Sequence, residues 1–297
     1  MRLRRDPEPP IPPLLPDGRV VNVPGRGEMF VREAPAPAPD APTVVLLHGW
    51  TASADLNWFA AYSDVARLAR LVAPDHRGHG RGLRSEERFS LEAAADDVAA
   101  LLRHLDAAPA VLVGYSMGGP IAMLAWHRHP DVVAGLVLQA TALEWRASWY
   151  ERFVWRFMAL VELSLRLGTP DGIIERLLRD AIERCPEIAP LRGWLKGELR
   201  RGDPADLAQA GRALGLYDAR PFAGSVDVPT VVVVTTKDRL VRPKKQRALA
   251  AAVPGARMLT LAADHDAPLL KMQEFRAVTT EALRLLSRTG AASPRSG

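Results

Sequence analysis

Short, fully apolar runs alternate along the chain with longer segments whose apolar residues recur every three or four positions. The runs Val44–Leu47 and Val231–Val234 contain no polar residue, which is typical of strands buried on both faces of a parallel sheet. The segment 91–105 has helical spacing, and Ser90 in front of it can cap a helix. The pattern predicts an α/β architecture. The expected strands are 19–23, 28–32, 44–47, 71–74, 110–114, 135–138, 231–234 and 257–261, and the expected helices are 58–70, 91–105, 117–129, 244–253 and 267–287.

The alternation stops between residues 141 and 222. This stretch has no strand-like run and reads as several helices, broken at Gly168-Thr169-Pro170, Cys185-Pro186 and Gly202-Asp203-Pro204. We therefore expect an all-helical lid over 141–222, inserted into a core formed by 19–140 and 223–287. The proline-rich residues 1–18 and residues 288–297 bury too little apolar area to offset the entropy of ordering, so disordered tails are expected there.

Composition excludes several classes of protein. With 297 residues, 48% of them hydrophobic, the chain can form one large core, and its single cysteine, Cys185, cannot form an intramolecular disulfide. It contains no apolar run of about 18 residues, so we expect a soluble, cytoplasmic protein. The net charge of +5 comes from arginines scattered among acids, which argues against nucleic acid as a partner.

One short motif suggests chemistry. Gly114-Tyr115-Ser116-Met117-Gly118 directly follows an apolar run and leads into a helical segment. A serine hydroxyl is a weak nucleophile that needs a base and donors for the developing oxyanion. The glycines at 114 and 118 allow the close backbone approach of a strained strand-to-helix turn that exposes Ser116. A glycine-rich turn without chemical meaning has the same short pattern, so its context has to decide.

That context is a set of loops that follow predicted parallel strands. The carboxyl ends of such strands share one edge of the sheet, where ligands bind. Ser116, Asp238 and His265 lie in three of these loops, and we expect them to act as nucleophile, orienting acid and general base. Glu144 is the alternative acid.

The loop after the strand 44–47 supplies the fourth part of the expected site. Backbone N–H groups of Trp50 and Met117 are expected to bind the oxyanion, and His48 and Gly49 to support this loop. No metal is expected, because His76 and His79 lack further ligands at zinc-like spacing.

With these motifs the chain resembles a member of the α/β-hydrolase superfamily, in particular a lidded serine esterase or lipase. The resemblance covers residues 19–287 and includes His48-Gly49-Trp50, the loop Asp75–Gly80, the serine turn and the chain order serine, acid, histidine. It implies a mostly parallel, doubly wound sheet with a helical lid, an acyl-enzyme mechanism and no cofactor. Ser116 argues against the epoxide hydrolases and dehalogenases of this family, which have aspartate in place of the serine.

The expected substrate is a small-molecule ester or acyl compound. Tyr115, Trp145, Trp149 and Phe153 are candidate pocket residues, and the aromatic residues after 141 favour an acyl chain or aromatic ring. Arginines alternate with them, which is compatible with weak membrane or lipid contact through the lid. Carbon–carbon hydrolase, thioesterase and lactonase activities remain open, as does a non-catalytic protein that binds an apolar ligand. The sequence indicates neither the natural substrate nor the oligomeric state.

Overall fold

The computed structural model describes residues 12–145 and 171–290. Its strands are β1 (Asp17–Val23), β2 (Gly27–Ala34), β3 (Thr43–Leu47), β4 (Arg70–Pro74), β5 (Ala110–Tyr115), β6 (Val133–Gln139), β7 (Thr230–Thr235) and β8 (Arg257–Leu261). Its α-helices are α1 (Ala54–Trp58), α2 (Tyr62–Ala66), α3 (Leu91–His104), α4 (Gly118–Arg128), α6 (Asp171–Arg184), α7 (Arg192–Leu199), α8 (Pro204–Leu216), α9 (Pro243–Ala252), α10 (Ala267–Leu270) and α11 (Met272–Gly290). Three 3₁₀ turns accompany them, η1 (Pro130–Val132), η2 (Pro186–Leu191) and η3 (Ala223–Ser225).

All eight strands form one sheet in the order β1-β2-β4-β3-β5-β6-β7-β8. The strands from β4 to β8 pair in parallel, whereas β1 and β2 pair antiparallel at one edge. Strand β3 lies between β4 and β5, so the chain order reverses in the middle of the sheet. In an open α/β sheet, the crevice at such a reversal is where ligands bind.

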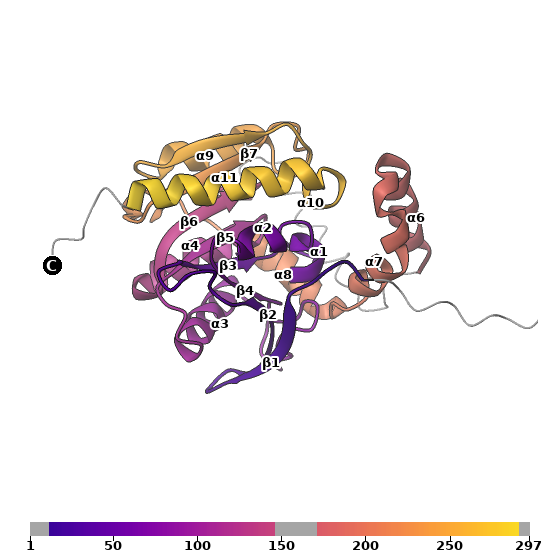
Figure 1. The fold of residues 1–297 in the computed structure, drawn as a ribbon, viewed down its shortest axis with the longest axis horizontal. Coiled ribbons are helices and arrows are strands. Elements are labelled where there is room, and N and C mark those ends of the chain that lie inside the picture. Colours follow the sequence, from indigo (N-terminus) through magenta and orange to yellow (C-terminus); the bar gives the residue numbers. More distant parts are fainter. Residues whose placement is uncertain (1–11, 146–170, 291–297) are drawn as a thin grey trace, which may run out of the picture.

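Helices cover both faces of the sheet (Figure 1). Along β7, Val232 and Val234 pack into the cluster that contains residues of α3, α4 and α9, while Val231 and Val233 pack into the cluster of α1, α2 and α11. Successive side chains of a strand point to opposite faces, so a central strand covered on both sides has to be apolar at every position. This explains the uninterrupted apolar runs that predicted the strands.

Two predicted helices are divided in the structure. The expected helix 58–70 is replaced by the short helices α1 and α2, followed by β4 from Arg70. The division lets Phe59 reach Trp194 of α7, with ring centroids 5.4 Å apart, while Trp58 packs on Phe275 of α11. The expected helix 267–287 is likewise divided into α10 and α11.

The ordered structure extends into both expected tails. Strand β1 begins at Asp17, and α11 continues to Gly290. Arg32 of β2 donates to the Pro16 carbonyl at 3.0 Å, which fixes the chain just before β1.

Helices also make up most of the described segment between β6 and β7. Apolar residues of α6, η2 and α7 form a small core of their own around Trp194 and Leu195, joined to the main body through Phe59. Helix α8 packs instead against the main core through Ala210 and Leu214. In Figure 1, α6 and α7 lie to one side of the sheet, beyond α1. The extent of a lid over 141–222 stays a prediction, because residues 146–170 lie outside the described part.

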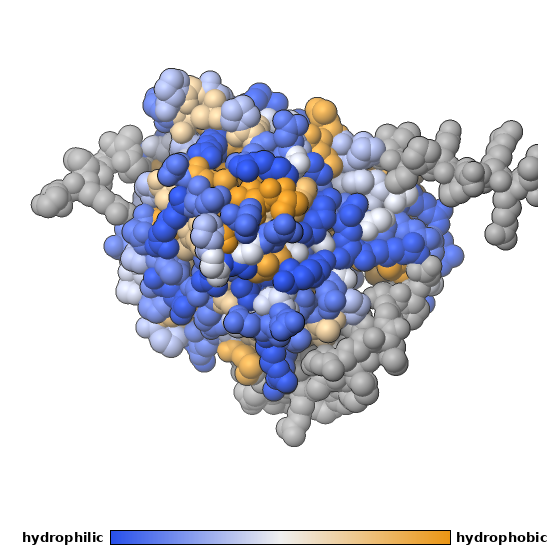
Figure 2. Space-filling model, turned by 90° about the horizontal axis from the view of Figure 1, so that it is seen from below, coloured by the Kyte–Doolittle hydropathy of each residue, from blue (hydrophilic) through white to orange (hydrophobic). Residues whose placement is uncertain are grey.

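Hydrophilic residues cover most of the face shown in Figure 2 and surround separate hydrophobic patches. Within residues 12–145 and 171–290, no helix has the length and apolar character needed to cross a membrane.

Candidate active site

Ser116 stands on a strained turn between β5 and α4. Its φ of 51° lies in the left-handed region, which costs energy for a residue with a side chain. The turn is held by the Ser116 N–H, which donates to the Gln139 carbonyl of β6 at 2.9 Å. A Cβ on Gly114 would lie 2.3 Å from the Gly118 carbonyl oxygen, and one on Gly118 would lie 2.1 Å from the Leu47 carbonyl oxygen. Both positions therefore have to be glycine for the turn to close.

The serine, histidine and aspartate from three different loops form a continuous hydrogen-bonded chain. His265 Nε2 lies 3.0 Å from Ser116 Oγ, and His265 Nδ1 lies 2.9 Å from Asp238 Oδ2. A carboxylate only accepts hydrogen bonds, so Nδ1 carries the proton and Nε2 has a free lone pair for the serine hydroxyl. This is the tautomer in which an imidazole can remove a proton from serine.

The Asp238 carboxylate is held on both oxygens. Its Oδ1 accepts the backbone N–H groups of Leu240 and Val241 at 2.9 and 2.8 Å. Its Oδ2 accepts from Thr235 Oγ1 at 2.7 Å and Gln246 Nε2 at 3.2 Å, in addition to His265. Asp238 is 3% exposed, and these five hydrogen bonds take the place of the water that its carboxylate loses on burial.

The backbone of His265 is also fixed. Tyr115 donates its hydroxyl to the His265 carbonyl at 2.7 Å, and the His265 N–H donates to Asp264 at 2.8 Å. Asp264 in turn forms an ion pair with Arg239, 2.6 Å away, beside the acid loop. His265 is thus held by hydrogen bonds at both ring nitrogens, at its backbone carbonyl and at its backbone N–H.

The loop after β3 lies directly beside Ser116. A Cβ on Gly49 would be 3.3 Å from the Ser116 Cβ, and the Gly49 N–H donates to Asn57 Oδ1 of α1 at 2.9 Å. His48 is fully buried: its Nδ1 lies 2.8 Å from the Gly49 carbonyl, and its Nε2 accepts the His76 N–H at 2.9 Å. Because Nε2 accepts, Nδ1 carries the proton and donates to that carbonyl. His48 therefore supports the loop as a neutral ring.

The two backbone N–H groups expected to bind the oxyanion belong to Trp50, in this loop, and to Met117, next to Ser116. Met117 immediately precedes α4, at the helix end where N–H groups lack an intrahelical acceptor and the helix dipole is positive. Trp50 is half-buried, and its indole Nε1 donates to the Leu207 carbonyl of α8 at 2.6 Å. That bond ties the loop to the last helix of the segment between β6 and β7.

Three buried histidines pack beneath the same loop. His48 lies 4.2 Å from His76 and 5.5 Å from His79, measured between ring centroids. Burial lowers the pKa of His48 to about 4 and that of His79 to about 3, and burial also lowers the pKa of His76. The three rings are therefore neutral and support the loop by packing against one another. Among the described residues, no group of three or more histidine, cysteine, aspartate or glutamate side chains could hold a metal ion.

A buried ionic network joins α7 to the core beside this site. Arg81 forms ion pairs with Asp55 at 2.8 Å, Asp75 at 3.2 Å and Glu198 of α7 at 3.2 Å. Ser53 adds a hydrogen bond to Glu198 at 2.6 Å. The network fixes α7 against the loops that precede α1 and follow β4.

The remaining predicted site residues are dispersed. Tyr115 is 3% exposed, packs edge-on against Trp58 and donates its hydroxyl to the His265 carbonyl, so it helps to position His265; its part in a substrate pocket stays a prediction. Trp145 is 6% exposed and belongs to the main core. Glu144, the alternative acid, pairs with Lys245 at 3.7 Å. Trp149 and Phe153 lie outside the described residues.

Sequence reasoning missed the residues that hold the site in place. Asn57, Thr235 and Gln246 each hydrogen-bond to a loop distant in sequence or to the acid itself. They are single polar residues on a short helix, at a strand end and on a helix face, and no spacing or motif distinguishes them from solvated residues.

Comparisons with known proteins agree with this fold. A model of the alpha/beta hydrolase fold matches residues 42–167. The chain is 30% identical over 266 residues to a pimeloyl-[acyl-carrier protein] methyl ester esterase of Neisseria meningitidis, covering 80% of this chain and 91% of that protein.

Solved structures with the same fold include esterases and lactonases. The enol-lactonase of Burkholderia xenovorans LB400 superposes with a TM-score of 0.77 at 25% identity, over 90% of this chain and 100% of that one. A thermophilic esterase from Thermogutta terrifontis has a TM-score of 0.76 at 22% identity, over 91% of this chain and 99% of that one, and this likeness concerns the fold alone. The eight-stranded sheet, the serine turn and these similarities together show that the chain belongs to the α/β-hydrolase family, alongside its ester-cleaving members.

Proposed function

We propose that this protein cleaves a carboxylic ester through an acyl-enzyme intermediate on Ser116, with His265 as general base and Asp238 as its orienting acid. The observation that carries the proposal is the pair of hydrogen bonds at 3.0 and 2.9 Å linking serine, histidine and aspartate. His265 is 27 positions from Asp238 and 149 positions from Ser116 in the sequence, so local folding alone does not bring the three side chains together.

The first half-reaction acylates the serine. Ser116 Oγ attacks the ester carbonyl carbon while His265 Nε2 takes the hydroxyl proton, giving a tetrahedral intermediate with a negative oxygen. The intermediate collapses when the bond to the alcohol oxygen breaks and His265 returns the proton to that oxygen. The alcohol leaves, and the acyl group remains on Ser116.

The second half-reaction repeats these steps with water. His265 removes a proton from a water molecule that attacks the acyl carbonyl, and then protonates Ser116 Oγ as it leaves. The products are a carboxylic acid and the free enzyme. Asp238 remains ionised throughout and stabilises the imidazolium that forms in each half.

Oxyanion stabilisation is assigned to the backbone N–H groups of Met117 and Trp50. The N-terminus of α4 adds a positive partial charge next to Met117. In enzymes of this type one such donor contributes about 2.7–4 kcal/mol to transition-state stabilisation. Backbone donors are rigid, so they require no reorganisation as the charge develops.

The substrate class is a small-molecule ester or acyl compound. The relative from Neisseria meningitidis acts, by its name, on a methyl ester of an acyl group held on acyl-carrier protein. Ester cleavage with an apolar acyl chain is therefore the reaction we expect here. Lactone hydrolysis is the second candidate, because the enol-lactonase is a neighbour at 25% identity and a lactone is an internal ester open to the same attack.

The test compares purified protein with its Ser116→Ala variant on p-nitrophenyl esters from C2 to C16, on a set of lactones and on acyl thioesters. We expect turnover of esters that falls to background in the variant, while both proteins melt at the same temperature. Ester turnover that persists in Ser116→Ala would exclude the proposed nucleophile. Binding without turnover of any substrate would favour a non-catalytic protein that holds an apolar ligand. Weak lipid contact through a lid and a cytoplasmic location stay predictions from the sequence.

A further inference from the structure

A threonine in the left-handed conformation lies in the loop that carries one of the two oxyanion donors. Thr51 has a φ of 62° and follows Trp50, whose backbone N–H is assigned to the oxyanion. The Ala52 N–H donates to the Gly49 carbonyl at 3.4 Å, which closes a turn with Thr51 at its third position. A positive φ at that position normally requires glycine or asparagine, and a β-branched residue with a positive φ is an outlier. The turn therefore has a shape that its sequence does not favour locally.

Backbone strain of this kind persists only where the surrounding structure enforces it. Hydrogen bonds hold the chain on both sides of Thr51. On one side, the Trp50 indole Nε1 donates to the Leu207 carbonyl of α8 at 2.6 Å. On the other side, the Ser53 hydroxyl donates to Glu198 of α7 at 2.6 Å. Two helices of the segment between β6 and β7 thus hold the two flanks of the strained turn.

Helix α7 is a firm support for Ser53. Glu198 is buried, and its carboxylate also accepts from Arg81 Nη1 at 3.2 Å and from Arg201 Nε at 2.8 Å. Hydrogen bonds between ionised groups are stronger than those between neutral groups, so the carboxylate is held firmly. Ser53 in turn caps α1, because its hydroxyl oxygen accepts the Leu56 N–H at 3.1 Å. The position of Ser53 is therefore fixed from both directions.

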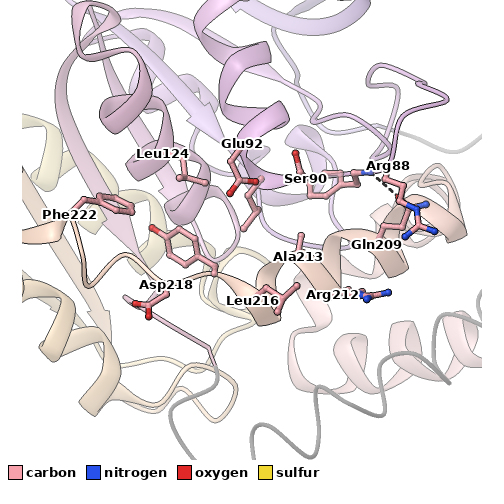
Figure 3. A pocket seen from close by; sticks show the side chains of 13 residues that line it. Arg88, Ser90, Glu92, Leu124, Gln209, Arg212, Ala213, Leu216, Asp218 and Phe222 are labelled. Atoms are coloured by element: carbon pink, nitrogen blue, oxygen red, sulfur yellow. Dashed lines mark hydrogen bonds between the residues drawn. The ribbon is translucent and has the colours of Figure 1, made fainter.

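Helix α8 is attached to the core on both sides of Leu207. Before Leu207, the Asp203 N–H donates to the Gly78 carbonyl at 3.0 Å. After it, the Gln209 side chain accepts the Phe89 N–H at 2.8 Å, on the segment that leads into α3 (Figure 3). The Leu207 carbonyl is therefore a fixed acceptor for the Trp50 indole.

The strained turn lies close enough to the reacting serine to affect its chemistry. A Cβ on Gly49, the first residue of the turn, would be 3.3 Å from the Ser116 Cβ. An oxyanion donor is effective only when it lies about 2.7–3.1 Å from the oxygen that becomes charged. A misplacement of about 1 Å can cost about 10²-fold in rate. Relaxation of Thr51 would therefore weaken binding of the transition state more than binding of the substrate.

We propose that α7 and α8 hold the oxyanion loop in the shape required for catalysis, with the Trp50 indole and Glu198 as positioning residues for the Trp50 N–H. This role presupposes the proposed ester cleavage, because the donor that is positioned belongs to that reaction. The two hydrogen bonds, Trp50 to Leu207 and Ser53 to Glu198, oppose the relaxation of Thr51. The segment between β6 and β7 thereby supports the transition state.

The Trp50→Phe variant tests the first of these hydrogen bonds, because it removes the indole N–H and keeps an aromatic ring. We expect kcat for p-nitrophenyl butyrate to fall about tenfold with little change in KM, which is less than the loss of about 10²–10³-fold on removing a whole oxyanion donor. The matched control is Trp126→Phe, because the Trp126 indole donates to Asp227 at 3.0 Å, between α4 and the segment before β7. This control loses an indole hydrogen bond away from the oxyanion loop and should keep the kcat and KM of the parent.

A double-mutant cycle tests the link to the strain at Thr51. Glycine adopts a positive φ without strain, so the turn can keep its shape in a Thr51→Gly background even when the indole bond is lost. Trp50→Phe should therefore lower kcat less than about threefold in that background. Glu198→Gln, in which only one oxygen can accept, should likewise lower kcat more in the parent than beside Thr51→Gly. Equal losses from Trp50→Phe in the two backgrounds would overturn the proposal.

Hydrogen–deuterium exchange measured by mass spectrometry gives a readout that does not depend on activity. The peptide covering residues 48–57 should exchange faster in Trp50→Phe than in the parent, and at the parent's rate in Trp126→Phe. Unchanged exchange in Trp50→Phe, or faster exchange with an unchanged kcat, would overturn the proposal. A parent protein that cleaves no ester would instead refute the proposed function, and the exchange of residues 48–57 would still decide whether α8 holds the turn.

Discussion

Replacing the orienting acid by its isosteric amide, Asp238→Asn, tests how the histidine is held. In the native site Asp238 Oδ1 accepts N–H groups of Leu240 and Val241 at 2.9 and 2.8 Å, while Oδ2 faces His265 Nδ1 at 2.9 Å. The new amide can keep its oxygen toward the two N–H groups only by turning its NH₂ group toward His265. His265 then has to accept at Nδ1 and carry its proton at Nε2, where it can no longer take the proton of Ser116.

The opposite amide orientation would restore the tautomer at a cost that the structure lets us estimate. It would aim the NH₂ group at the part-buried N–H of Leu240 and the buried N–H of Val241 and leave both without an acceptor, at about 1–3 kcal/mol each. The sum of about 2–6 kcal/mol corresponds to a fraction of correct tautomer between about 1 in 30 and 1 in 10⁴. We expect kcat to decrease in proportion to this fraction. The loss should be near the larger value, about 10⁴-fold, because the same substitution in a serine triad costs about that much.

The assay is steady-state turnover of a p-nitrophenyl ester at pH 7–9, with circular dichroism to show that the variant is folded. Glu144→Gln serves as matched control, because Glu144 is the alternative acid and pairs with Lys245 instead. The control should retain nearly full kcat. An Asp238→Asn enzyme within tenfold of the parent, or a large loss in Glu144→Gln, would refute the reasoning.

Two predictions concern stability. Gly118→Ala would bring a Cβ to 2.1 Å from the Leu47 carbonyl oxygen, so we expect a loss of more than about 3 kcal/mol in urea unfolding; a near-native midpoint would show that the turn can relax. His48 and His79 have folded pKa values of about 4 and about 3, below the unfolded value of 6.5. The unfolded chain therefore binds more protons as the pH falls below 6.5, and stability present above that pH should decrease by about 2 kcal/mol per histidine at pH 5. Equal unfolding free energies at pH 7 and pH 5 would contradict neutral, buried rings.

The central strands could be located in the sequence because a parallel sheet covered on both faces requires apolar residues at every position. The run Val231–Val234 is such a case, since its alternate valines enter opposite core clusters. That Ser116, Asp238 and His265 lie close together could be predicted for a related reason: each follows a predicted strand, and strand ends share one edge. The hydrogen bonds between them required coordinates.

The division of the expected helix 58–70 could not be read from the chain. Trp58, Phe59 and Tyr62 have the spacing of one continuous helix, but tertiary contacts place Phe59 against Trp194 while Trp58 and Tyr62 enter the opposite core. Packing of this kind overrides local helix preference. The supporting residues Asn57 and Gln246 were missed for the complementary reason, because a single polar side chain carries no periodic signal.

Mass-spectrometric mapping of the adduct formed with a fluorophosphonate probe tests the central claim most directly. The account predicts a single adduct on the peptide that contains Ser116, formed by the native protein and lost in a folded His265→Ala variant, since the serine then lacks its base. An adduct on a different residue, or an unmodified Ser116 in correctly folded protein, would contradict it.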